Sequence, residues 1–218
     1  MKTRLVIFDL DGTLLNTISD LGMACNHALS AFGLPTHDIS LYPRMVGNGV
    51  NRLIERALPL ELRSEDMVMK LKPQFLSYYN HHNTDCTVPY SGIPELLHYL
   101  REQGIMLAVA SNKYQAAVDA LITHYFPGIF CCVAGEKEGV PRKPDPAIVD
   151  CIITQTGIDE GVVYVGDSLV DIQTAKNAHL PIIACTWGFQ KADELIAADP
   201  YKVVNNCEEL KCALISDM

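Results

Sequence analysis

Two carboxylates lie directly after the first apolar segment of the chain. The segment Leu5–Phe8 is a continuous run of branched and aromatic residues, which indicates a strand buried on both faces, and Asp9 and Asp11 follow it. Side chains two positions apart in extended chain point to the same side, so these acids should converge on one small volume. Like charges that close require a proton or a cation between them, and carboxylate oxygens suit Mg²⁺. Taken alone, the acids and Gly12 also fit a simple Asp-Gly turn.

Three further polar clusters carry residue types that are used in phosphate chemistry. Ser111 and Asn112 follow one apolar run, Lys143 precedes a Pro-Asp-Pro segment, and Asp167 and Asp171 follow another apolar run. Each cluster has a structural alternative when it is taken alone. The first fits a helix N-cap, the lysine fits a solvated loop cation, and the last two acids fit a helix start that favours negative charge.

The elements that must position these clusters alternate between strand and helix patterns. Strands are expected at 5–8, 105–110, 129–133, 162–165 and 181–185, with a weak one at 202–204, and helices at 93–103, 114–124, 147–156 and 169–178. This alternation predicts an α/β fold with a parallel sheet of about five strands and right-handed crossovers. Ligands of such sheets bind beyond the carboxyl ends of the strands, where all the polar clusters lie.

One interval breaks the alternation and contains only helical patterns, at 18–32, 50–58 and 64–79. An all-helical block between the first two strands predicts an inserted cap domain over the active site. The expected domains are therefore a core made of residues 1–15 and 85–218 and a cap made of residues 16–84.

In this order along the chain, the motifs resemble those of the haloacid dehalogenase-like hydrolase superfamily. The matching residues are Asp9-Leu10-Asp11-Gly12-Thr13, Ser111, Lys143-Pro144-Asp145-Pro146 and Gly166-Asp167-Ser168-Leu169-Val170-Asp171. The core and its insertion account for essentially the whole chain. The resemblance implies a Rossmann-like parallel sheet flanked by helices, with an inserted α-helical cap, and it implies a catalytic role for each motif.

The resemblance implies covalent catalysis by a carboxylate. Asp9 would attack phosphorus and form an aspartyl-phosphate, while Asp11 would protonate the leaving alcohol and later deprotonate the attacking water. Ser111 would donate a hydrogen bond to the phosphate and Lys143 would neutralise its charge. Thr13 would support the loop that carries the two acids and is expected at the substrate.

A magnesium ion is the expected cofactor. Asp9, Asp167 and the backbone carbonyl of Asp11 would be its ligands. Asp171 is expected behind them, where it would orient water ligands of the ion or hold Lys143.

The substrate is narrowed by Asp11 and by the cap. Dehalogenase members of the superfamily lack an acid at this position, because a halide needs no proton, so the chain looks like a phosphatase or phosphotransferase. The cap segment 45–52 is similar to one that phosphoglycolate phosphatases place over their substrate. Asn48, Gly49 and Arg52, together with Asn112 in the core, are therefore expected to bind substrate, with Arg52 or Arg44 pairing a carboxylate. The alternative is a turn before a helix with Arg52 exposed.

The expected function is Mg²⁺-dependent hydrolysis of a small phosphate monoester, most similar to that of phosphoglycolate phosphatases. Alternatives in the same superfamily are a pyrophosphatase, a sugar-phosphate or nucleotide phosphatase, a phosphomutase, and a non-catalytic binding protein. The net charge is −9, from 17 basic and 26 acidic residues, and argues against nucleic acid or an anionic membrane as partner. With no signal-like or membrane-spanning apolar run, we expect a cytoplasmic monomer or homodimer that binds a small phosphorylated metabolite.

Overall fold

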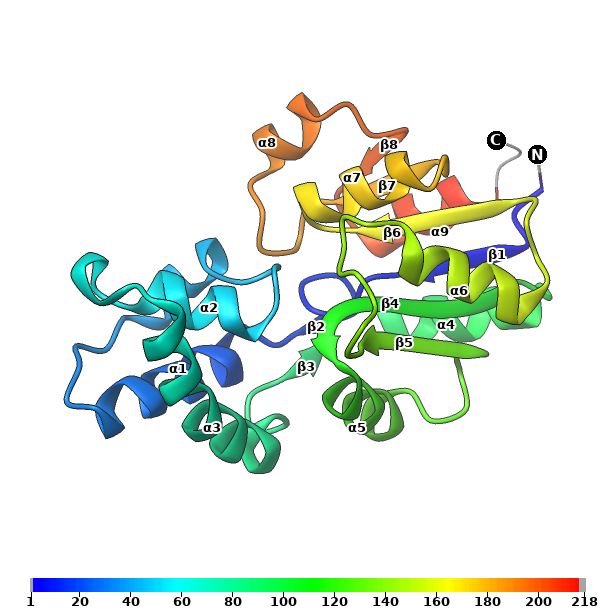
Figure 1. Ribbon diagram of the computed structural model, residues 1–218. Coiled ribbons are helices and arrows are strands. Elements are labelled where there is room, and N and C mark those ends of the chain that lie inside the picture. Colours follow the sequence, from blue (N-terminus) through cyan, green and yellow to red (C-terminus); the bar gives the residue numbers. More distant parts are fainter. Residues whose placement is uncertain (1, 216–218) are drawn as a thin grey trace. The chain divides into compact units, whose positions relative to one another are not determined.

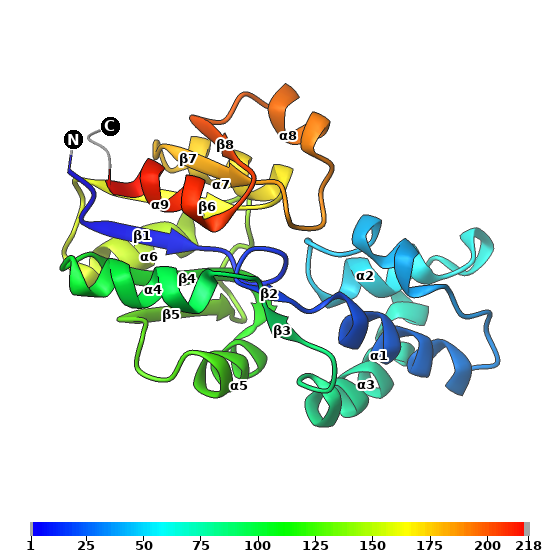
Figure 2. The ribbon, with the colours of Figure 1, turned by 180° about the vertical axis from the view of Figure 1, so that it is seen from behind.

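The computed structural model describes residues 2–215. Within this range the chain divides into two compact units. The sheet unit contains the residues up to Leu15 and those from Pro89 onward, and the helical unit is Asn16–Val88. Figures 1 and 2 show the ribbon from opposite sides. None of the helices in residues 2–215 is both long and apolar enough to cross a membrane.

The sheet unit is built on a parallel sheet. Among the described residues its strands are β1 (Leu5–Phe8), β4 (Met106–Tyr114), β5 (Cys132–Glu136), β6 (Val162–Gly166), β7 (Ile182–Cys185) and β8 (Lys202–Val204). Its helices are α4 (Ile93–Glu102), α5 (Gln115–Tyr125), α6 (Ala147–Thr156), α7 (Leu169–Asn177), α8 (Ala192–Ala197) and α9 (Cys207–Ile215). The strand order is β5-β4-β1-β6-β7-β8, with parallel pairing throughout, which confirms the expected fold class.

Helices cover both faces of this sheet. Alternate residues of β1 face opposite layers, and all four of its side chains are fully buried. Val6 and Phe8 pack in the layer with α4, α5 and α9, and Leu5 and Ile7 pack in the layer with α6, α7 and α8. Figure 1 shows α6 in front of the sheet, and Figure 2 shows α4 and α9 on the opposite face. Burial on both faces explains the unbroken apolar run of this strand.

The register of the sheet aligns the positions where the apolar runs of three strands end. Phe8, the last residue of β1, pairs with Val109 of β4 on one side and with Val165 of β6 on the other. The polar residues that follow these three positions therefore emerge at the same edge of the sheet.

Two strands differ from the expectation. Strand β4 continues through Tyr114, so Ser111 and Asn112 belong to it, and the N-cap of α5 is Tyr114. The N-cap interpretation of Ser111 is therefore wrong. Strand β5 begins at Cys132 and not at 129, and its pairing with β4 is irregular between Ala110 and Tyr114. The polar end of β4 stays in the sheet because Glu136 of β5 pairs with Tyr114.

The helical unit has a core of its own. It contains α1 (Ile18–Ala31), the 3₁₀ turns η1 (Ile39–Arg44) and η2 (Leu60–Leu62), α2 (Val50–Ala57) and α3 (Glu65–His82). Leu29, Ile54 and Phe75 are fully buried in it. Helix α3 begins at the expected cap, where the Ser64 hydroxyl accepts a hydrogen bond from the Met67 N–H at 3.3 Å.

The chain passes between the units through two short paired strands, β2 (Leu15–Asn16) and β3 (Val88–Pro89). Before β3, the segment is held to the first turn of α1 by Asp20, which is 1 % exposed. Asp20 accepts hydrogen bonds from the backbone N–H of Cys86 at 3.0 Å and from the N–H and hydroxyl of Thr87 at 2.9 and 2.7 Å. One buried carboxylate thus anchors the chain where it leaves the helical unit.

Candidate active site

Asp9 is the first residue beyond β1, and its backbone N–H donates to the Val165 carbonyl at 2.9 Å. This bond continues the β1–β6 ladder by one step and directs the carboxylate over the end of the sheet. The carboxylate is 2.8 Å from the Lys143 Nζ. Burial raises the pKa of Asp9 to about 7; the negative charge of Asp171 adds to this, and Lys143 opposes it.

Lys143 lies at the centre of a buried network at this edge. Its ammonium donates to Asp9 Oδ1 at 2.8 Å, Asp171 Oδ1 at 2.7 Å, the Ala110 carbonyl at 2.9 Å and the Tyr164 hydroxyl at 3.1 Å. Burial alone would lower the pKa of Lys143, but the charges of Asp171 and Asp9 raise it well above its usual value. The interpretation of Lys143 as a solvated loop cation is therefore wrong, since its side chain is 2 % exposed.

Asp171 is tied to the protein through both carboxylate oxygens. Oδ1 accepts from Lys143, and Oδ2 accepts from the Ser168 N–H at 3.1 Å and the Ser168 hydroxyl at 2.6 Å. Ser168 is the N-cap of α7 and forms a capping box with Asp171. Asp171 therefore caps a helix and also holds Lys143.

Asp167 follows β6 and is also enclosed. Its Oδ1 accepts from the Thr13 hydroxyl at 3.0 Å and its Oδ2 accepts from the Phe189 N–H at 2.8 Å. Burial, together with Asp171 and Asp9, raises the pKa of Asp167 well above its usual value. Thr13 was expected at the substrate, but it is fully buried and its side chain orients this carboxylate.

Glycines allow the chain to approach Asp167 closely. A Cβ on Gly12 or on Gly188 would lie 2.3 Å from its Oδ2. Gly188 comes after β7, and its neighbour Trp187 donates its indole N–H to the Thr13 carbonyl at 3.1 Å. The segment after β7 therefore helps to build the site, although no charged residue in it marked it in the sequence.

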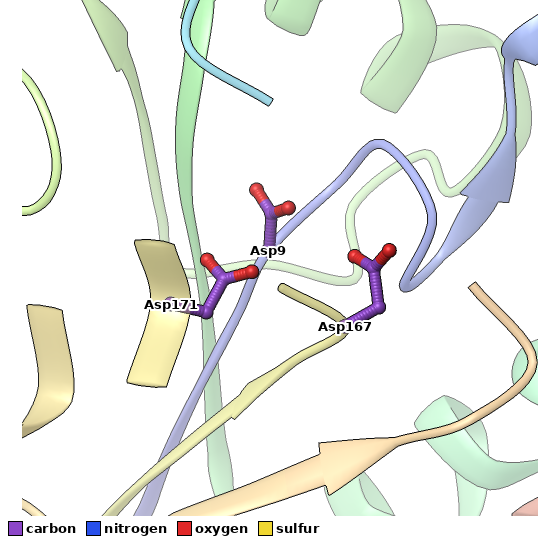
Figure 3. Close-up of side chains that lie close together, drawn as sticks. All are labelled: Asp9, Asp167 and Asp171. Carbon is purple, nitrogen blue, oxygen red and sulfur yellow. The ribbon is translucent and has the colours of Figure 1, made fainter. Parts of the chain in front are cut away.

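The acids of this edge suit a divalent cation. Asp9, Asp167 and Asp171 each offer an oxygen within 4.8 Å of the others. Figure 3 shows the three carboxylates together; Asp9 follows β1, whereas Asp167 follows β6 and Asp171 lies in the first turn of α7. Each oxygen of Asp171 already accepts two hydrogen bonds, from Lys143 and Tyr164 on one side and from Ser168 on the other. Each oxygen of Asp167 accepts one, so Asp9 and Asp167 are the better ligands of this group. Burial is the main cause of the raised pKa values of these two acids, and the neighbouring carboxylates add to it; an oxygen-liganded ion such as Mg²⁺ would offset both effects.

Asp11 faces a second lysine. The Lys113 Nζ lies 2.8 Å from Asp11 Oδ2, and the two side chains are 3 % and 19 % exposed. The side chain of Asp11 is therefore held by Lys113. Sequence reasoning assigned no role to Lys113, although its position two residues after Ser111 in an extended strand was a usable signal.

Ser111 and Asn112, the two residues of β4 that were expected in the site, are both buried. The Ser111 hydroxyl accepts from the Lys113 N–H at 3.2 Å. Asn112 was expected to bind substrate, but its side-chain amide lies on the backbone of Lys143, at 2.9 Å and 3.1 Å. Asn112 therefore positions the backbone of Lys143.

In the helical unit, Arg56 holds the loop that is expected to bind substrate. Arg56 donates to the Met45 carbonyl at 2.9 Å and to Asn48 Oδ1 at 2.7 Å. Arg52, in contrast, is 61 % exposed and pairs with Glu55 at 2.5 Å. The Gly49 φ of 81° gives the loop a conformation that favours glycine.

Comparison with known proteins places this architecture in a family. Residues 6–185 match the family model described as haloacid dehalogenase-like hydrolase. A phosphoglycolate phosphatase from Mesorhizobium japonicum is 36 % identical, with 87 % of this chain and 85 % of that protein covered. One from Agrobacterium fabrum is 34 % identical, with coverage of 98 % and 93 %. The crystal structure of a protein from Lactobacillus delbrueckii subsp. bulgaricus has a TM-score of 0.95, 33 % identity and full coverage of both chains. Because the family model matches most of this chain and these relatives are similar over nearly their whole length, the chain belongs to the haloacid dehalogenase-like hydrolases.

Proposed function

We propose that this protein is a Mg²⁺-dependent phosphatase that hydrolyses 2-phosphoglycolate, or a similarly small phosphate monoester, through a phosphorylated Asp9. The observation that carries the proposal is the 2.8 Å contact between Asp9 and the buried ammonium of Lys143, with Asp167 beside them. A carboxylate that is poised with a fixed cation at the end of a strand can accept a phosphoryl group and stabilise its charge.

In the first step, an oxygen of Asp9 forms a bond to phosphorus and the bond between phosphorus and the ester oxygen breaks. Asp11 donates a proton to the departing alkoxide, so the alcohol leaves neutral. Lys143 and the Ser111 hydroxyl offset the charge on the equatorial phosphoryl oxygens. A magnesium ion held by Asp9, Asp167 and the Asp11 carbonyl would supply further positive charge to the phosphoryl group.

In the second step, Asp11 takes a proton from a water molecule, whose oxygen attacks phosphorus. The bond between phosphorus and Asp9 breaks, which releases inorganic phosphate and restores the carboxylate. Asp11 thus acts first as an acid and then as a base, and the proton that it gives up in the first step is regained in the second.

We assign the helical unit, Asn16–Val88, as the cap of this enzyme. Its loop around Asn48 and Gly49 has backbone amides at the start of α2, which suit a small anion. The named activity of the relatives from M. japonicum and A. fabrum supports phosphoglycolate as the substrate.

The test is a panel assay of the full chain with Mg²⁺. Release of inorganic phosphate is measured from 2-phosphoglycolate, pyrophosphate, hexose phosphates and nucleoside monophosphates. We expect the highest kcat/KM for 2-phosphoglycolate, no turnover by Asp9→Asn and no turnover in excess EDTA. Undiminished hydrolysis by Asp9→Asn would refute the mechanism. A higher kcat/KM for pyrophosphate or a sugar phosphate would keep the mechanism and replace the substrate.

A further inference from the structure

Lys113 is the cation closest to the acid that handles the leaving group. Its ammonium lies 2.8 Å from Asp11 Oδ2, and both residues belong to the strand ends that carry Asp9 and Ser111. Lys143, in contrast, contacts Asp9 and Asp171. The two buried lysines of the sheet unit therefore serve different acids, one beside the phosphoryl group and one beside the departing alcohol.

A substrate whose alcohol carries a carboxylate meets an electrostatic problem at Asp11. In 2-phosphoglycolate the carboxylate is bonded to the carbon that carries the ester oxygen, so it lies within a few ångströms of any group that protonates that oxygen. Asp11 becomes a carboxylate as it gives up its proton, and two carboxylates at that separation repel each other unless a cation lies between them. An ammonium has several N–H donors and can contact two carboxylates at once. At 3 % exposure, the charge of Lys113 is also screened little by water.

We propose that Lys113 binds the carboxylate of the leaving group and so selects phosphate esters of small anionic alcohols. This inference rests on the proposed phosphatase function. It assigns to the sheet unit a task that the sequence had suggested for Arg52 of the helical unit. The structure supports the change, since the Arg52 side chain is 61 % exposed and paired with Glu55, while the Arg56 guanidinium contacts carbonyls of its own loop.

The test compares two esters that differ in one group. 2-Hydroxyethyl phosphate has the carbon skeleton of 2-phosphoglycolate, with a CH₂OH group in place of the carboxylate. In Lys113→Met we expect KM for 2-phosphoglycolate to rise about 10- to 100-fold, the equivalent of one charged hydrogen bond. Loss of the contact between Lys113 and Asp11 should lower kcat for both esters. KM for 2-hydroxyethyl phosphate should nevertheless stay within about 2-fold, because this ester has no carboxylate for Lys113 to contact. Lys202→Met, at an exposed position of β8, is the matched control and should change neither KM.

An equal rise of KM for both esters in Lys113→Met would mean that Lys113 acts only through Asp11, and this result would overturn the inference. An unchanged KM for both esters in Lys113→Met would overturn the inference as well. So would a rise of KM for 2-phosphoglycolate alone in Arg52→Met that is absent in Lys113→Met. If the unaltered enzyme showed no preference between the esters, the proposed substrate would already have failed before any variant was made.

A second measurement separates binding from catalysis and from folding. In the Asp9→Asn background, calorimetry should show that Lys113→Met weakens binding of 2-phosphoglycolate about 10- to 100-fold more than binding of 2-hydroxyethyl phosphate. Should Lys113→Met not fold, Lys113→Arg replaces it: the retained charge should preserve the preference for the anionic ester. Loss of the preference in a folded Lys113→Arg, with unchanged turnover of the neutral ester, would contradict recognition by charge.

Discussion

The side-chain amide of Asn112 is paired with the backbone of Lys143 at both of its polar ends. The Lys143 N–H donates to Oδ1 at 2.9 Å, and Nδ2 donates to the Lys143 carbonyl at 3.1 Å. Asn112 lies in β4, whereas Lys143 lies 31 positions later in the segment before α6. A residue in a rigid strand thus fixes the backbone of a loop residue whose ammonium must reach Asp9.

Asn112→Ala should therefore reduce both kcat and folding stability. Removal of the amide leaves a buried N–H and a buried carbonyl without their partner, at a cost of about 1–3 kcal/mol. The loosened Lys143 should lower kcat about 10- to 100-fold, the usual effect of removing a group that orients a catalytic residue. Steady-state kinetics with 2-phosphoglycolate and urea denaturation measure the two effects.

Asn177→Ala is the matched control for this variant. Asn177 donates its side-chain amide to the carbonyl of Pro144, the neighbour of Lys143, at 2.8 Å, but this contact is exposed. We expect kcat of Asn177→Ala to lie within about 2-fold of the unaltered enzyme, since an exposed group exchanges its partner for water at little cost. Equal losses in the two variants would show that the Asn112 pairing has no particular role.

Asp167 and Asp171 should differ in their effect on magnesium. Asp171→Asn should lower kcat about 10- to 100-fold, because it removes one of the two carboxylates that hold Lys143, yet leave the half-saturating Mg²⁺ concentration nearly unchanged. Asp167→Asn should raise that concentration at least about 10-fold, because it replaces a charged ligand with a neutral amide. Activity titrated against Mg²⁺ measures both. A large rise of the half-saturating concentration in Asp171→Asn would instead make Asp171 a metal ligand.

The sequence predicted most of this fold because its strands carry local signals. Apolar runs that end in acids located β1 and β6, and the predicted bounds of α6 and β8 agree with the structure at both ends. The strand that became β4 was expected to end at residue 110, before its polar residues, because polar residues in a strand normally face water. Here Asn112 and Lys113 are buried, since partners 31 and 102 positions away satisfy them.

The contacts that the sequence did not predict are long-range and leave no periodic trace. Nothing in the pattern around Phe189 indicates that its backbone N–H would reach Asp167, 22 positions earlier. Which arginine of α2 contacts the loop depends on which face of the helix meets the Met45 carbonyl, and the fold of the loop decides this. Motifs therefore identified the acids of the site but not the groups that orient them.

The helical unit should depend on Asp20 for its stability. Asp20→Ala removes the acceptor of three hydrogen bonds from Cys86 and Thr87, and we expect a loss of about 1–3 kcal/mol or more in the free energy of unfolding. Asp20→Asn keeps one side-chain oxygen and should lose less. Urea denaturation measures the loss, and amide hydrogen exchange at Thr87 should accelerate in Asp20→Ala.

The exposed Asp38 provides the comparison for Asp20. It also accepts hydrogen bonds from a backbone N–H and a hydroxyl, both of Ser40, but water can replace it there. Asp38→Ala should therefore cost clearly less than Asp20→Ala. If the two losses were equal, burial of the Asp20 carboxylate would contribute nothing to the anchor.

Gly188→Ala should weaken magnesium binding although it replaces no charged residue. The added Cβ would lie 2.3 Å from Oδ2 and from Cβ of Asp167, a separation that real atoms do not adopt, so the carboxylate must move. The displaced Asp167 would lose its alignment with the Phe189 N–H, now 2.8 Å away, and with Asp9. We expect the half-saturating Mg²⁺ concentration to rise about 10- to 100-fold, as it does when a group that orients a metal ligand is lost.

Gly22→Ala also creates a steric clash, but with Ile39 and Tyr42 at 2.8 Å in the helical unit. It should lower the melting temperature and leave the Mg²⁺ dependence unchanged, and an equal change of Mg²⁺ dependence in both variants would mean that general destabilisation, and not the position of Asp167, is the cause.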